Sequence, residues 1–470
     1  MVGKADVLSD YVWGDCGKGK DGERILKNGN YSLVIRPNGA DNAGRHEKVK
    51  GIKVGMHQIP PGFKNPTMKL YLGNGCLTNP ISLCEEISDV RNAGINLEGR
   101  LGISSKVSFI QPHHKYLDGL LGGGVGTTGK GIGFGYSDRA KRMHGNMQVD
   151  LRIGDYFVNK KSAEQIVKFN LEKLVNDFPQ LGGKINIDKA WTLFKKAADK
   201  LESHVICDPM YVIRKLEVGE NALINMANGY FLDLVEGTHP TVTSSRTGSA
   251  GGFLGAEVPL KYLGKVYGVA KFPMTRVGNG PFPSELGGDL SYDHCSEEGG
   301  YRYVAEIEKA TFNVNEFLNA GDYFHLGIAL RILGGEYGAT TKRPRRMGMP
   351  DLVLLKQACM KNGADYLGIN KFDCLEHFSR AKWLSGIPVV TGYKLDGESI
   401  DYLPTTNAEC ERLETVVDFI PHITEDITGI RRKEDLPNSV TNAVGIMQEY
   451  LGRKIDCIGV GPGNDQYVEL

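Results

Sequence analysis

The stretch Trp13–Lys20 constrains the fold of this chain more than any other. It reads Trp-Gly-Asp-Cys-Gly-Lys-Gly-Lys, with an apolar run of strand character before it and a helix-like segment from about Asp21. Three glycines in six positions let the backbone curl until its N–H groups point inward, and such a nest ahead of a helix attracts phosphate oxygens. Lys18 and Lys20 add positive charge. The residues predict a strand, a phosphate-binding turn and a helix, although a glycine-rich turn without function would also fit them.

Asp15 is the unusual member of this stretch. A carboxylate beside bound phosphates repels them unless it holds a metal ion or accepts a proton from a substrate. The common phosphate loop ends in Gly-Lys-Ser/Thr, and its hydroxyl binds magnesium. No hydroxyl follows Lys20, so Asp15 is the predicted metal ligand. Either role of this carboxylate implies chemistry.

Composition narrows the classes of function. The chain has 470 residues, and 56 Lys+Arg against 56 Asp+Glu give a formal net charge of zero. Proteins that bind nucleic acid or a membrane surface usually carry a basic excess, so an anion site must be local here. The nine cysteines form no close Cys-x-x-Cys pairs, which is typical of reduced thiols. With no apolar stretch of membrane-spanning length and no signal-peptide pattern, we predict a cytoplasmic protein.

Short runs of strand character alternate with helical patterns. Alternation of this kind favours an α/β fold with a large, mostly parallel central sheet flanked by helices. Although length alone suggests two or three domains, we predict one elaborated domain over residues 1–470, with helical excursions near 156–201 and 285–335. The predicted strands are Tyr31–Arg36, Lys69–Leu72, Val107–Ile110, Phe231–Leu234, Val266–Ala270, Tyr366–Ile369 and Pro388–Tyr393.

The first excursion contains two helical patterns. Ser162 and Gln165 have capping-box spacing ahead of the first pattern. Apolar residues recur at helical spacing in both: Ile166, Phe169, Leu174 and Phe178 in the first, and Trp191, Phe194, Ala197 and Leu201 in the second.

Two further clusters have residues that suit anions. Gly122–Gly135 places Thr127, Thr128 and Lys130 among glycines, which suits a phosphate or, equally, a mobile surface loop. Gly338–Arg346 has two threonines followed by four cations in five positions. Because arginine forks pair bidentately with carboxylates, and because the chain is neutral, we interpret the second cluster as a small-anion site, with a solvated face as the alternative.

A third motif follows a predicted strand. Asn370-Lys371-Phe372-Asp373 comes directly after Tyr366–Ile369, and Asn-Lys-x-Asp in that position is typical of guanine recognition. The aspartate accepts hydrogen bonds from the ring N1–H and the 2-amino group, while the lysine stem packs on the ring. The motif favours GTP over ATP. Gly459–Pro462 either closes the other side of the base or is a plain C-terminal turn.

Together these motifs resemble the adenylosuccinate synthetase family over nearly the whole chain. The resemblance implies a P-loop-NTPase-like α/β fold and a cytoplasmic homodimer that makes adenylosuccinate from IMP, L-aspartate and GTP with Mg²⁺. The matching stretches are Trp13–Lys20, Asp41–Gly44, Gly73–Gly75, Gly126–Gly133, Arg152–Asp155, Val242–Ser245, Thr275–Gly278, Gly280–Pro283, Gly338–Thr341 and Asn370–Asp373.

The resemblance also implies roles for individual residues. Asp15 takes the proton from purine N1 and binds Mg²⁺ with the Gly44 carbonyl, Lys18 sits on the phosphates, and Arg142 comes from the partner subunit. The implied GTP-binding residues are Gly14, Cys16, Gly17, Lys18, Gly19, Lys20, Arg345, Asn370, Lys371, Asp373, Gly459 and Gly461. The purine nucleotide is assigned to Asp15, Asn42, Thr128, Arg142, Asn228, Thr243 and Arg343, and the amino acid to Thr340, Thr341, Arg343 and Arg345.

The chain departs from the family pattern near the purine 6-position. The family's Asn-Ala-Gly-His is Asn42-Ala43-Gly44-Arg45 here, followed by His46. That histidine is the family's general acid, and arginine cannot donate a proton near neutral pH, so Arg45 and His46 are both candidate catalytic residues. Cys16 and Asn228 replace a Glu and a Gln. In the Gly338–Arg346 cluster, which we call the arginine clamp, Lys342 replaces a glycine and Pro344 replaces an arginine. Residues 285–335 are also longer than the family's usual segment.

The expected function is that of a GTP-dependent ligase that joins L-aspartate to C6 of IMP through a 6-phosphoryl intermediate. One alternative is a divergent relative that acts on GMP or dGMP, as phage enzymes that make 2-aminoadenine precursors do. Those relatives often carry Ser where this chain has Asp15, which favours IMP. A non-catalytic purine-nucleotide sensor is the alternative from another class, but a sensor needs no clamp for an amino acid.

Overall fold

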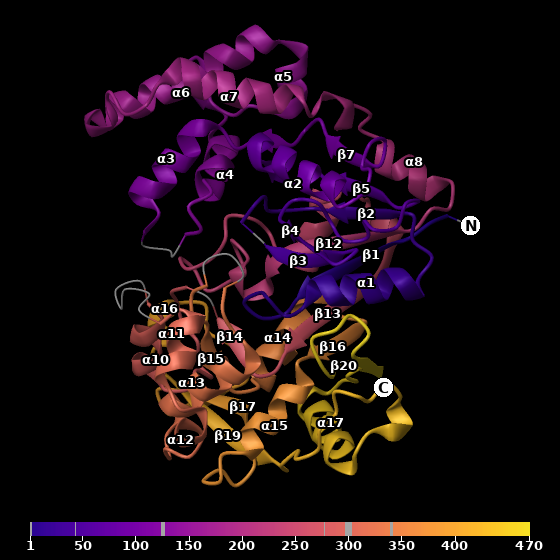
Figure 1. The fold of residues 1–470 in the computed structure, drawn as a ribbon, viewed down its shortest axis with the longest axis vertical. Helices are drawn as coiled ribbons and strands as arrows, with labels where there is room; N and C mark the ends of the chain where they lie inside the picture. Colours follow the sequence, from indigo (N-terminus) through magenta and orange to yellow (C-terminus); the bar gives the residue numbers. More distant parts are fainter. Residues whose placement is uncertain (1, 43, 124–126, 277, 297–302, 339–341) are drawn as a thin grey trace. The chain divides into compact units, whose positions relative to one another are not determined.

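The computed structural model has the α/β architecture that the alternating patterns predict (Figure 1). It describes residues 2–42, 44–123, 127–276, 278–296, 303–338 and 342–470, except for the side chains at positions 45, 46, 48 and 53. The largest sheet has ten strands in the order β11-β7-β5-β2-β12-β1-β13-β16-β20-β21. Neighbouring strands from β11 to β12 and from β13 to β20 run parallel, and only the pair β20 and β21 is antiparallel among the registers determined.

The chain divides into two compact units, which we describe separately. Unit 1 contains residues 1–7, 25–227 and 243–264, and unit 2 contains residues 8–24, 228–242 and 265–470. The boundaries cut through strand β1 (Ala5–Asp10), helix α1 (Lys18–Asn28), strand β12 (Ala222–Gly229) and strand β13 (Leu263–Lys271). A single elaborated domain stays a prediction.

Unit 1 packs helices on its part of the sheet. In the core, Tyr156, Trp191 and Phe194 pack with Phe109. The strands are β2 (Leu33–Arg36), β3 (Arg45–Val49), β4 (Ile52–Met56), β5 (Lys69–Leu72), β6 (Leu77–Thr78), β7 (Leu101–Ser104), β8 (Ser108–Phe109), β9 (Met143–His144), β10 (Met147–Gln148) and β11 (Val205–Ile206). The helices are α2 (Pro80–Asn92), α3 (Pro112–Leu121), α4 (Ile132–Lys141), α5 (Ile153–Val158), α6 (Lys160–Asp177), α7 (Ile187–Asp199), α8 (Tyr211–Glu217) and α9 (Ser249–Gly255).

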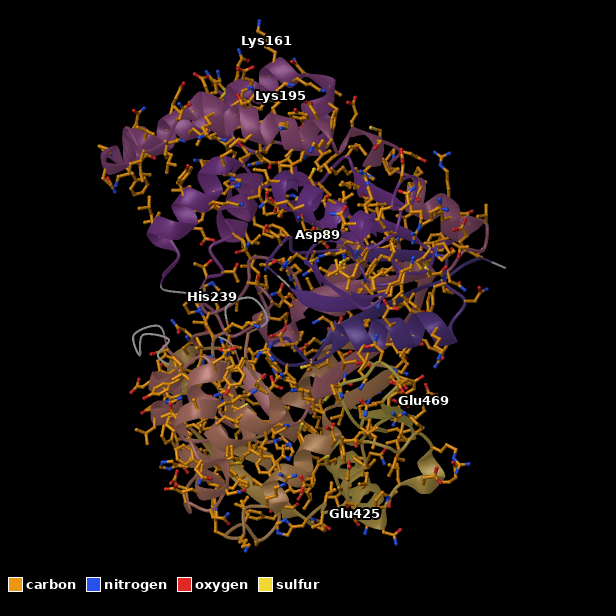
Figure 2. All side chains as sticks on the ribbon, in the orientation of Figure 1. Asp89, Lys161, Lys195, His239, Glu425 and Glu469 are labelled. Carbon is orange, nitrogen blue, oxygen red and sulfur yellow. The ribbon has the colours of Figure 1, made fainter. Side chains whose placement is uncertain are left out.

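Helices α6 and α7 confirm the two helical patterns predicted between residues 156 and 201. They lie side by side in Figure 1, and the exposed Lys161 and Lys195 mark their outer surface in Figure 2. The predicted capping box is wrong, because α6 begins two residues before Ser162. Asn159 caps the helix instead, since its side chain accepts a hydrogen bond from the Ser162 N–H.

Unit 2 contains most of the residues that the sequence assigns to GTP. Its strands are β14 (Met274–Arg276), β15 (Arg346–Gly348), β16 (Tyr366–Asn370), β17 (Ile387–Leu395), β18 (Glu398–Ile400), β19 (Leu413–Ile420), β20 (Cys457–Gly459) and β21 (Tyr467–Glu469). Its helices are α10 (Gly288–Cys295), α11 (Ala305–Thr311), α12 (Val314–Leu318), α13 (Tyr323–Gly334), α14 (Leu352–Asn362), α15 (Glu376–Ser379), α16 (Asn407–Cys410) and α17 (Asn438–Leu451). Four of these helices, α10 to α13, lie in the second predicted excursion.

The strand predicted at Phe231–Leu234 is wrong. Residues Tyr230–Leu232 form a 3₁₀ turn, and the strand of this region, β12, ends at Gly229. Asn225 and Asn228 interrupt the apolar run of β12, which hid the strand from a pattern of hydrophobic residues. The remaining predicted strands coincide with or overlap β2, β5, β8, β13, β16 and β17. Within the described ranges, no helix is both long and apolar enough to span a membrane.

Candidate active site

The glycine loop of unit 2 is organised by Asp10, the last residue of β1. The fully buried carboxylate of Asp10 accepts hydrogen bonds from the N–H groups of Val12 (3.0 Å), Gly14 (3.2 Å) and Cys16 (3.0 Å). Gly14, Asp15 and Gly17 all have positive φ, which explains the glycines that flank Asp15. The sequence analysis missed Asp10, although a carboxylate at the carboxyl end of a buried strand is a signal for a functional loop.

The backbone N–H groups that this loop can offer to a phosphate lie in the first turn of α1. Because the N–H groups of Gly14 and Cys16 donate to Asp10, the first turn of α1 supplies the N–H groups that helix geometry leaves without acceptors, those of Lys18, Gly19 and Lys20. Lys18 Nζ lies 2.7 Å from the Asn228 carbonyl and 3.3 Å from Asp10. In this structure the N–H groups of Gly14 and Cys16 therefore donate within the loop, and the contacts of these two residues with GTP stay predictions.

Lys20 is directed away from the loop. Its ammonium donates to the carbonyl oxygens of Gly461 and Gln466, each over 2.8 Å. Burial lowers the pKa of Lys20, and the neighbouring carboxylates oppose that shift. In this structure the Lys20 ammonium thus holds the segment that follows β20, and its contact with GTP stays a prediction.

Asp15 stands at one end of a chain of charges in unit 2. Its side chain is 47% exposed, and its Oδ2 lies 2.6 Å from Arg345 Nη2. Arg345 Nη1 in turn lies 2.5 Å from Glu336, which is buried. Glu336 also forms ion pairs with Lys271, whose Nζ lies 2.9 Å from its carboxylate, and with Lys371, whose Nζ lies 2.5 Å from it. Three cations and two carboxylates leave one positive charge, which suits a site for a bound anion.

The cations determine the protonation of Glu336. Burial alone would raise the pKa of this carboxyl, but Lys271, Lys371 and Arg345 lower it far below its usual range. Glu336 is therefore ionised and holds all three cations in place. The sequence analysis did not identify Lys271 or Glu336, although Glu336 lies only two residues before the Gly338–Arg346 cluster.

The Asn370–Asp373 motif is joined to the glycine loop. Asn370 Nδ2 lies 2.8 Å from the Cys16 carbonyl and 2.5 Å from Asp21 Oδ2. Lys371 has a left-handed backbone conformation, and its ammonium donates to the Gly334 carbonyl. Asp373 Oδ1 is buried and has no hydrogen-bond partner among the described residues, and burial raises its pKa. A buried acceptor without a donor fits a ligand that brings N–H groups, as guanine does.

Unit 1 contains four of the seven residues that the sequence assigns to the purine nucleotide, namely Asn42, Thr128, Arg142 and Thr243. Asn42 accepts a hydrogen bond from the Ala40 N–H at 3.1 Å, and Thr128 and Arg142 are exposed. Thr243 is half-buried, and the backbone of Gly44 is exposed. Asn228, in unit 2, has a buried Oδ1 that finds no donor among the described residues.

Several predicted residues cannot be placed. Thr340 and Thr341 lie outside the described residues, as do the side chains of Arg45 and His46, whose backbone forms β3. Arg343 is described, and its carbonyl accepts a hydrogen bond from the Gly338 N–H at 2.8 Å.

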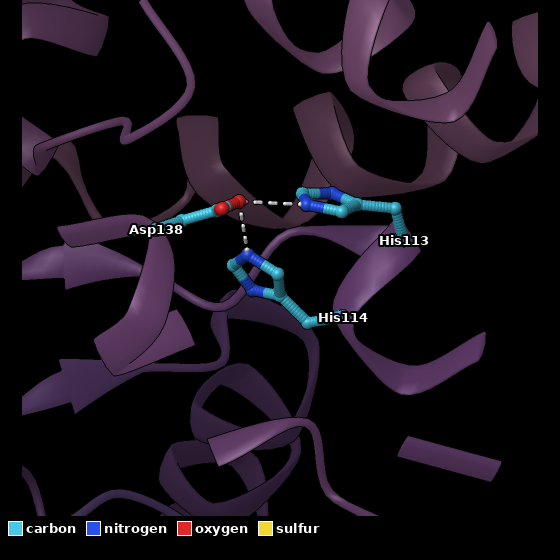
Figure 3. A group of neighbouring side chains, drawn as sticks. All are labelled: His113, His114 and Asp138. Carbon is cyan, nitrogen blue, oxygen red and sulfur yellow. Dashed lines mark hydrogen bonds and ion pairs between the residues drawn. The ribbon is translucent and has the colours of Figure 1, made fainter. Parts of the chain in front are cut away.

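A buried pair of histidines flanks the loop that contains Thr128. Figure 3 shows His113 and His114 of α3 pointing at one oxygen of Asp138 on α4, at 2.9 and 3.1 Å. The three side chains lie close enough together to ligate a metal ion. However, the Gln111 N–H donates to His114 Nδ1, so Nε2 of His114 carries the proton and is a hydrogen-bond donor to Asp138.

The histidine pair is therefore a brace between two helices. Asp118 of α3 accepts the Gly131 N–H at 2.7 Å and holds the other end of the same loop. Burial lowers the pKa of His113 to about 4, with a further lowering by His114, so His113 is neutral at physiological pH. This brace fixes both ends of the segment between α3 and α4.

Comparisons with known proteins cover the whole chain. A family model described as adenylosuccinate synthetase matches residues 7–468. Adenylosuccinate synthetase 2 of Cupriavidus pinatubonensis is 32% identical over 466 residues, which are 99% of this chain and 97% of the relative. Adenylosuccinate synthetase of Cutibacterium acnes is 33% identical over 476 residues, 99% of this chain and 98% of the relative.

Solved structures agree with this assignment. The fully ligated adenylosuccinate synthetase of Plasmodium falciparum aligns over 100% of both chains with a TM-score of 0.81 and 28% identity. The cyanophage S-2L succinoaminodeoxyadenylate synthetase, bound to dGMP and dATP, aligns over 100% of this chain and 96% of its own with a TM-score of 0.59. At 15% identity the second likeness shows the fold alone. Motifs, fold and relatives agree, and the chain belongs to the adenylosuccinate synthetase family.

Proposed function

We propose that this chain joins L-aspartate to C6 of IMP at the expense of GTP and releases adenylosuccinate, GDP and phosphate. Membership of the family makes it a GTP-dependent C–N ligase of purine nucleotide biosynthesis. The observation that carries the assignment of residues is the half-exposed carboxylate of Asp15, which stands at the phosphate loop and contacts Arg345.

Asp15 is the proposed base of the first step. Its carboxylate takes the proton from purine N1, so the ring electrons move to the 6-oxygen and make it nucleophilic. That oxygen forms a bond to the γ-phosphorus while the bond to the β-phosphate oxygen breaks and GDP leaves. Lys18 and the N–H groups at the start of α1 neutralise the charge on the phosphates.

The second step replaces phosphate by the amino acid. The aspartate amine, after losing a proton, forms a bond to C6, and the C6–O bond breaks to release phosphate. Arg343, Arg345, Thr340 and Thr341 are proposed to hold the carboxylates of the amino acid. Arg45 and His46 stay the candidates for the group that assists the 6-oxygen, and His46→Asn separates them, since a large loss of rate identifies His46.

Mg²⁺ is the cofactor that the family implies. The carboxylate of Asp15 and the exposed Gly44 carbonyl are oxygen donors of the kind that Mg²⁺ prefers. When bound, the ion would neutralise phosphate charge. Both residues keep the chemistry that such a site needs.

IMP is the proposed acceptor because its N1–C2 edge offers the hydrogen-bond pattern that the Asp15 carboxylate can satisfy. In IMP the N1–H is a single donor and C2 carries only hydrogen, so one carboxylate oxygen satisfies that edge. GMP and dGMP add a 2-amino donor that needs a second acceptor, and a site built for one hydrogen-bond pattern rejects another strongly. The relatives at 31–33% identity are named adenylosuccinate synthetases.

Competition among the acceptors tests this proposal. IMP, GMP and dGMP at equal concentration are incubated with the enzyme, GTP, L-aspartate and Mg²⁺, and the succinylated products are measured by mass spectrometry. We expect the IMP product to dominate. A dominant dGMP product overturns IMP as the acceptor, and no product or phosphate release with any acceptor overturns the ligase in favour of the sensor.

A homodimer with shared active sites is proposed from Arg142. The residue is exposed at the C-terminal end of α4, the helix that follows the segment containing Thr128. Mixing inactive Arg142→Leu with inactive Asp15→Ala is expected to restore part of the activity, because a hybrid dimer contains one intact site. Hybrid dimers without activity would contradict the sharing. We also propose that the enzyme works in the cytoplasm.

A further inference from the structure

A buried carboxylate in the long 285–335 segment connects that segment to the arginine clamp. Glu308 of α11 is fully buried and accepts hydrogen bonds from three side chains. Arg331 of α13 donates to it from Nε at 2.9 Å and Nη2 at 2.6 Å, the Tyr337 hydroxyl at 2.6 Å, and His294 Nε2 lies at 2.6 Å. Figure 1 shows α10, α11 and α13 grouped beside β15 in unit 2.

The partners of Glu308 hold the backbone near Arg343 and Arg345. The main chain of Tyr337 pairs with that of Pro344 in an antiparallel bridge, and the neighbouring Gly338 N–H donates to the Arg343 carbonyl. Arg331 Nη1 donates to the carbonyl of Arg345 at 3.1 Å. Glu308 therefore fixes Tyr337 directly, and Arg345 through Arg331.

The same segment also fixes the residue after Arg345. Arg346 Nε donates to Glu285 at 2.8 Å, and the Leu286 N–H donates to the Met347 carbonyl. Arg345 thus has its backbone held from two directions by residues of the long segment. Its guanidinium, which reaches Asp15 and Glu336, starts from a backbone whose position depends on that segment.

The charges of this cluster favour a rigid ionic contact. Burial alone would raise the pKa of Glu308, but hydrogen bonds from His294 and Arg331 hold it at about 2, so it is ionised at physiological pH. An ionised carboxylate paired with arginine in a buried site tolerates little displacement, since loss of one partner leaves an uncompensated charge.

We propose that Glu308 is a positioning residue for the amino-acid site: through Tyr337 and Arg331 it holds the backbones of Arg343 and Arg345 ready for the carboxylates of L-aspartate. The proposal rests on the function proposed above for Arg343 and Arg345. It gives Glu308 a role in affinity for the amino acid rather than for GTP. The long segment meets the Asn370–Asp373 motif at the Gly334 carbonyl, which accepts a hydrogen bond from Lys371, and Glu308 takes no part in that bond.

Steady-state kinetics of matched variants test the proposal. Glu308→Gln keeps the shape of the side chain and removes its charge, and Tyr337→Phe removes one donor. Glu306→Gln, an exposed position on the same helix, is the control. We expect Glu308→Gln to raise the KM for L-aspartate roughly tenfold or more, the effect of one charged hydrogen bond, while the KM for GTP changes less than about twofold.

Tyr337→Phe is expected to raise the KM for aspartate by a smaller factor, and Glu306→Gln to leave all constants unchanged. The double variant Glu308→Gln/Tyr337→Phe should show less than the product of the two single effects, because both act through one contact. Equal increases in KM for GTP, IMP and aspartate, or no increase for aspartate in either variant, would overturn the positioning role. If Glu308→Gln does not fold, Tyr337→Phe decides alone.

Hydrogen exchange separates this proposal from the proposed reaction. In the free enzyme, Glu308→Gln is expected to speed amide exchange in a peptide covering residues 336–346, while Glu306→Gln does not. A wild-type enzyme that fails to consume aspartate overturns the proposed substrate and leaves this measurement valid. Unchanged exchange in Glu308→Gln overturns the brace, whatever the substrate is.

Discussion

Asn370 donates a hydrogen bond from Nδ2 to the carbonyl oxygen of Cys16 over 2.8 Å. This bond ties the beginning of the Asn370–Asp373 motif to the glycine loop. A Cβ at Gly17 would lie 2.8 Å from Asn370 Nδ2, and a Cβ at Gly459 would lie 2.5 Å from Oδ1. The two glycines are therefore required by close approach to one asparagine side chain.

Asn370→Asp should weaken GTP binding through this contact. The substitution places an oxygen where the amide donated, against the Cys16 carbonyl and Asp21 Oδ2, so two hydrogen bonds become repulsive contacts. We expect a loss of roughly 1–3 kcal/mol in GTP affinity, measured by titration calorimetry. Gly17→Ala should cause a loss of the same kind. Wild-type affinity in both variants would exclude Asn370 as the link.

Asp373→Asn should change which base the site accepts. The buried Oδ1 of Asp373 has no donor among the described residues, and guanine supplies N1–H and 2-amino donors. An amide at this position donates as well as accepts, so xanthosine triphosphate should gain and GTP should lose roughly 1.5–3 kcal/mol. Initial rates with GTP, xanthosine triphosphate and ATP measure the change. A wild-type enzyme that uses ATP as well as GTP would contradict guanine recognition.

Lys18 and Lys20 should have different kinetic effects although they are two residues apart. Lys18 stays beside the loop, so Lys18→Met is expected to lower kcat by roughly 10²-fold or more. Lys20 donates to the Gly461 and Gln466 carbonyls, so Lys20→Met should lower thermal stability and raise the KM for GTP with a small change in kcat. Equal losses of kcat in both variants would instead support Lys20 as a phosphate ligand.

His113 should make the stability of the enzyme depend on pH. Its pKa is about 4 in the folded protein against 6.5 for an ordinary histidine, so the unfolded chain binds more protons between these values. The free energy of unfolding is therefore unaffected by this histidine above about pH 6.5. It decreases as the pH falls from there toward 4.

We expect wild-type enzyme to lose about 2 kcal/mol more than His113→Asn between pH 7.5 and pH 5. Urea unfolding at the two pH values measures the difference, and His144→Asn, at an exposed position, is the control. The same pH dependence in both variants would show that His113 is not the group that titrates.

The sequence by itself was sufficient for the fold class and for the family. Glycines that need positive φ, such as Gly14 and Gly17, and local motifs such as Asn370–Asp373 are short-range features, and their residue types report directly on backbone conformation and chemistry. Helix α6 was also predictable from its apolar spacing, whereas its start at Asn159 was not, because two capping patterns overlap there.

The partners of the charged residues depended on tertiary structure. Lys271, Glu336 and Glu308 acquire their roles from residues distant in sequence that folding brings within hydrogen-bond distance. Lys20 shows the same point in reverse, since a lysine beside a phosphate loop has the same sequence signal whichever way its side chain extends. The sequence specifies which charged groups are present and how they are spaced along the chain. Only long-range packing decides which group of opposite charge each one pairs with.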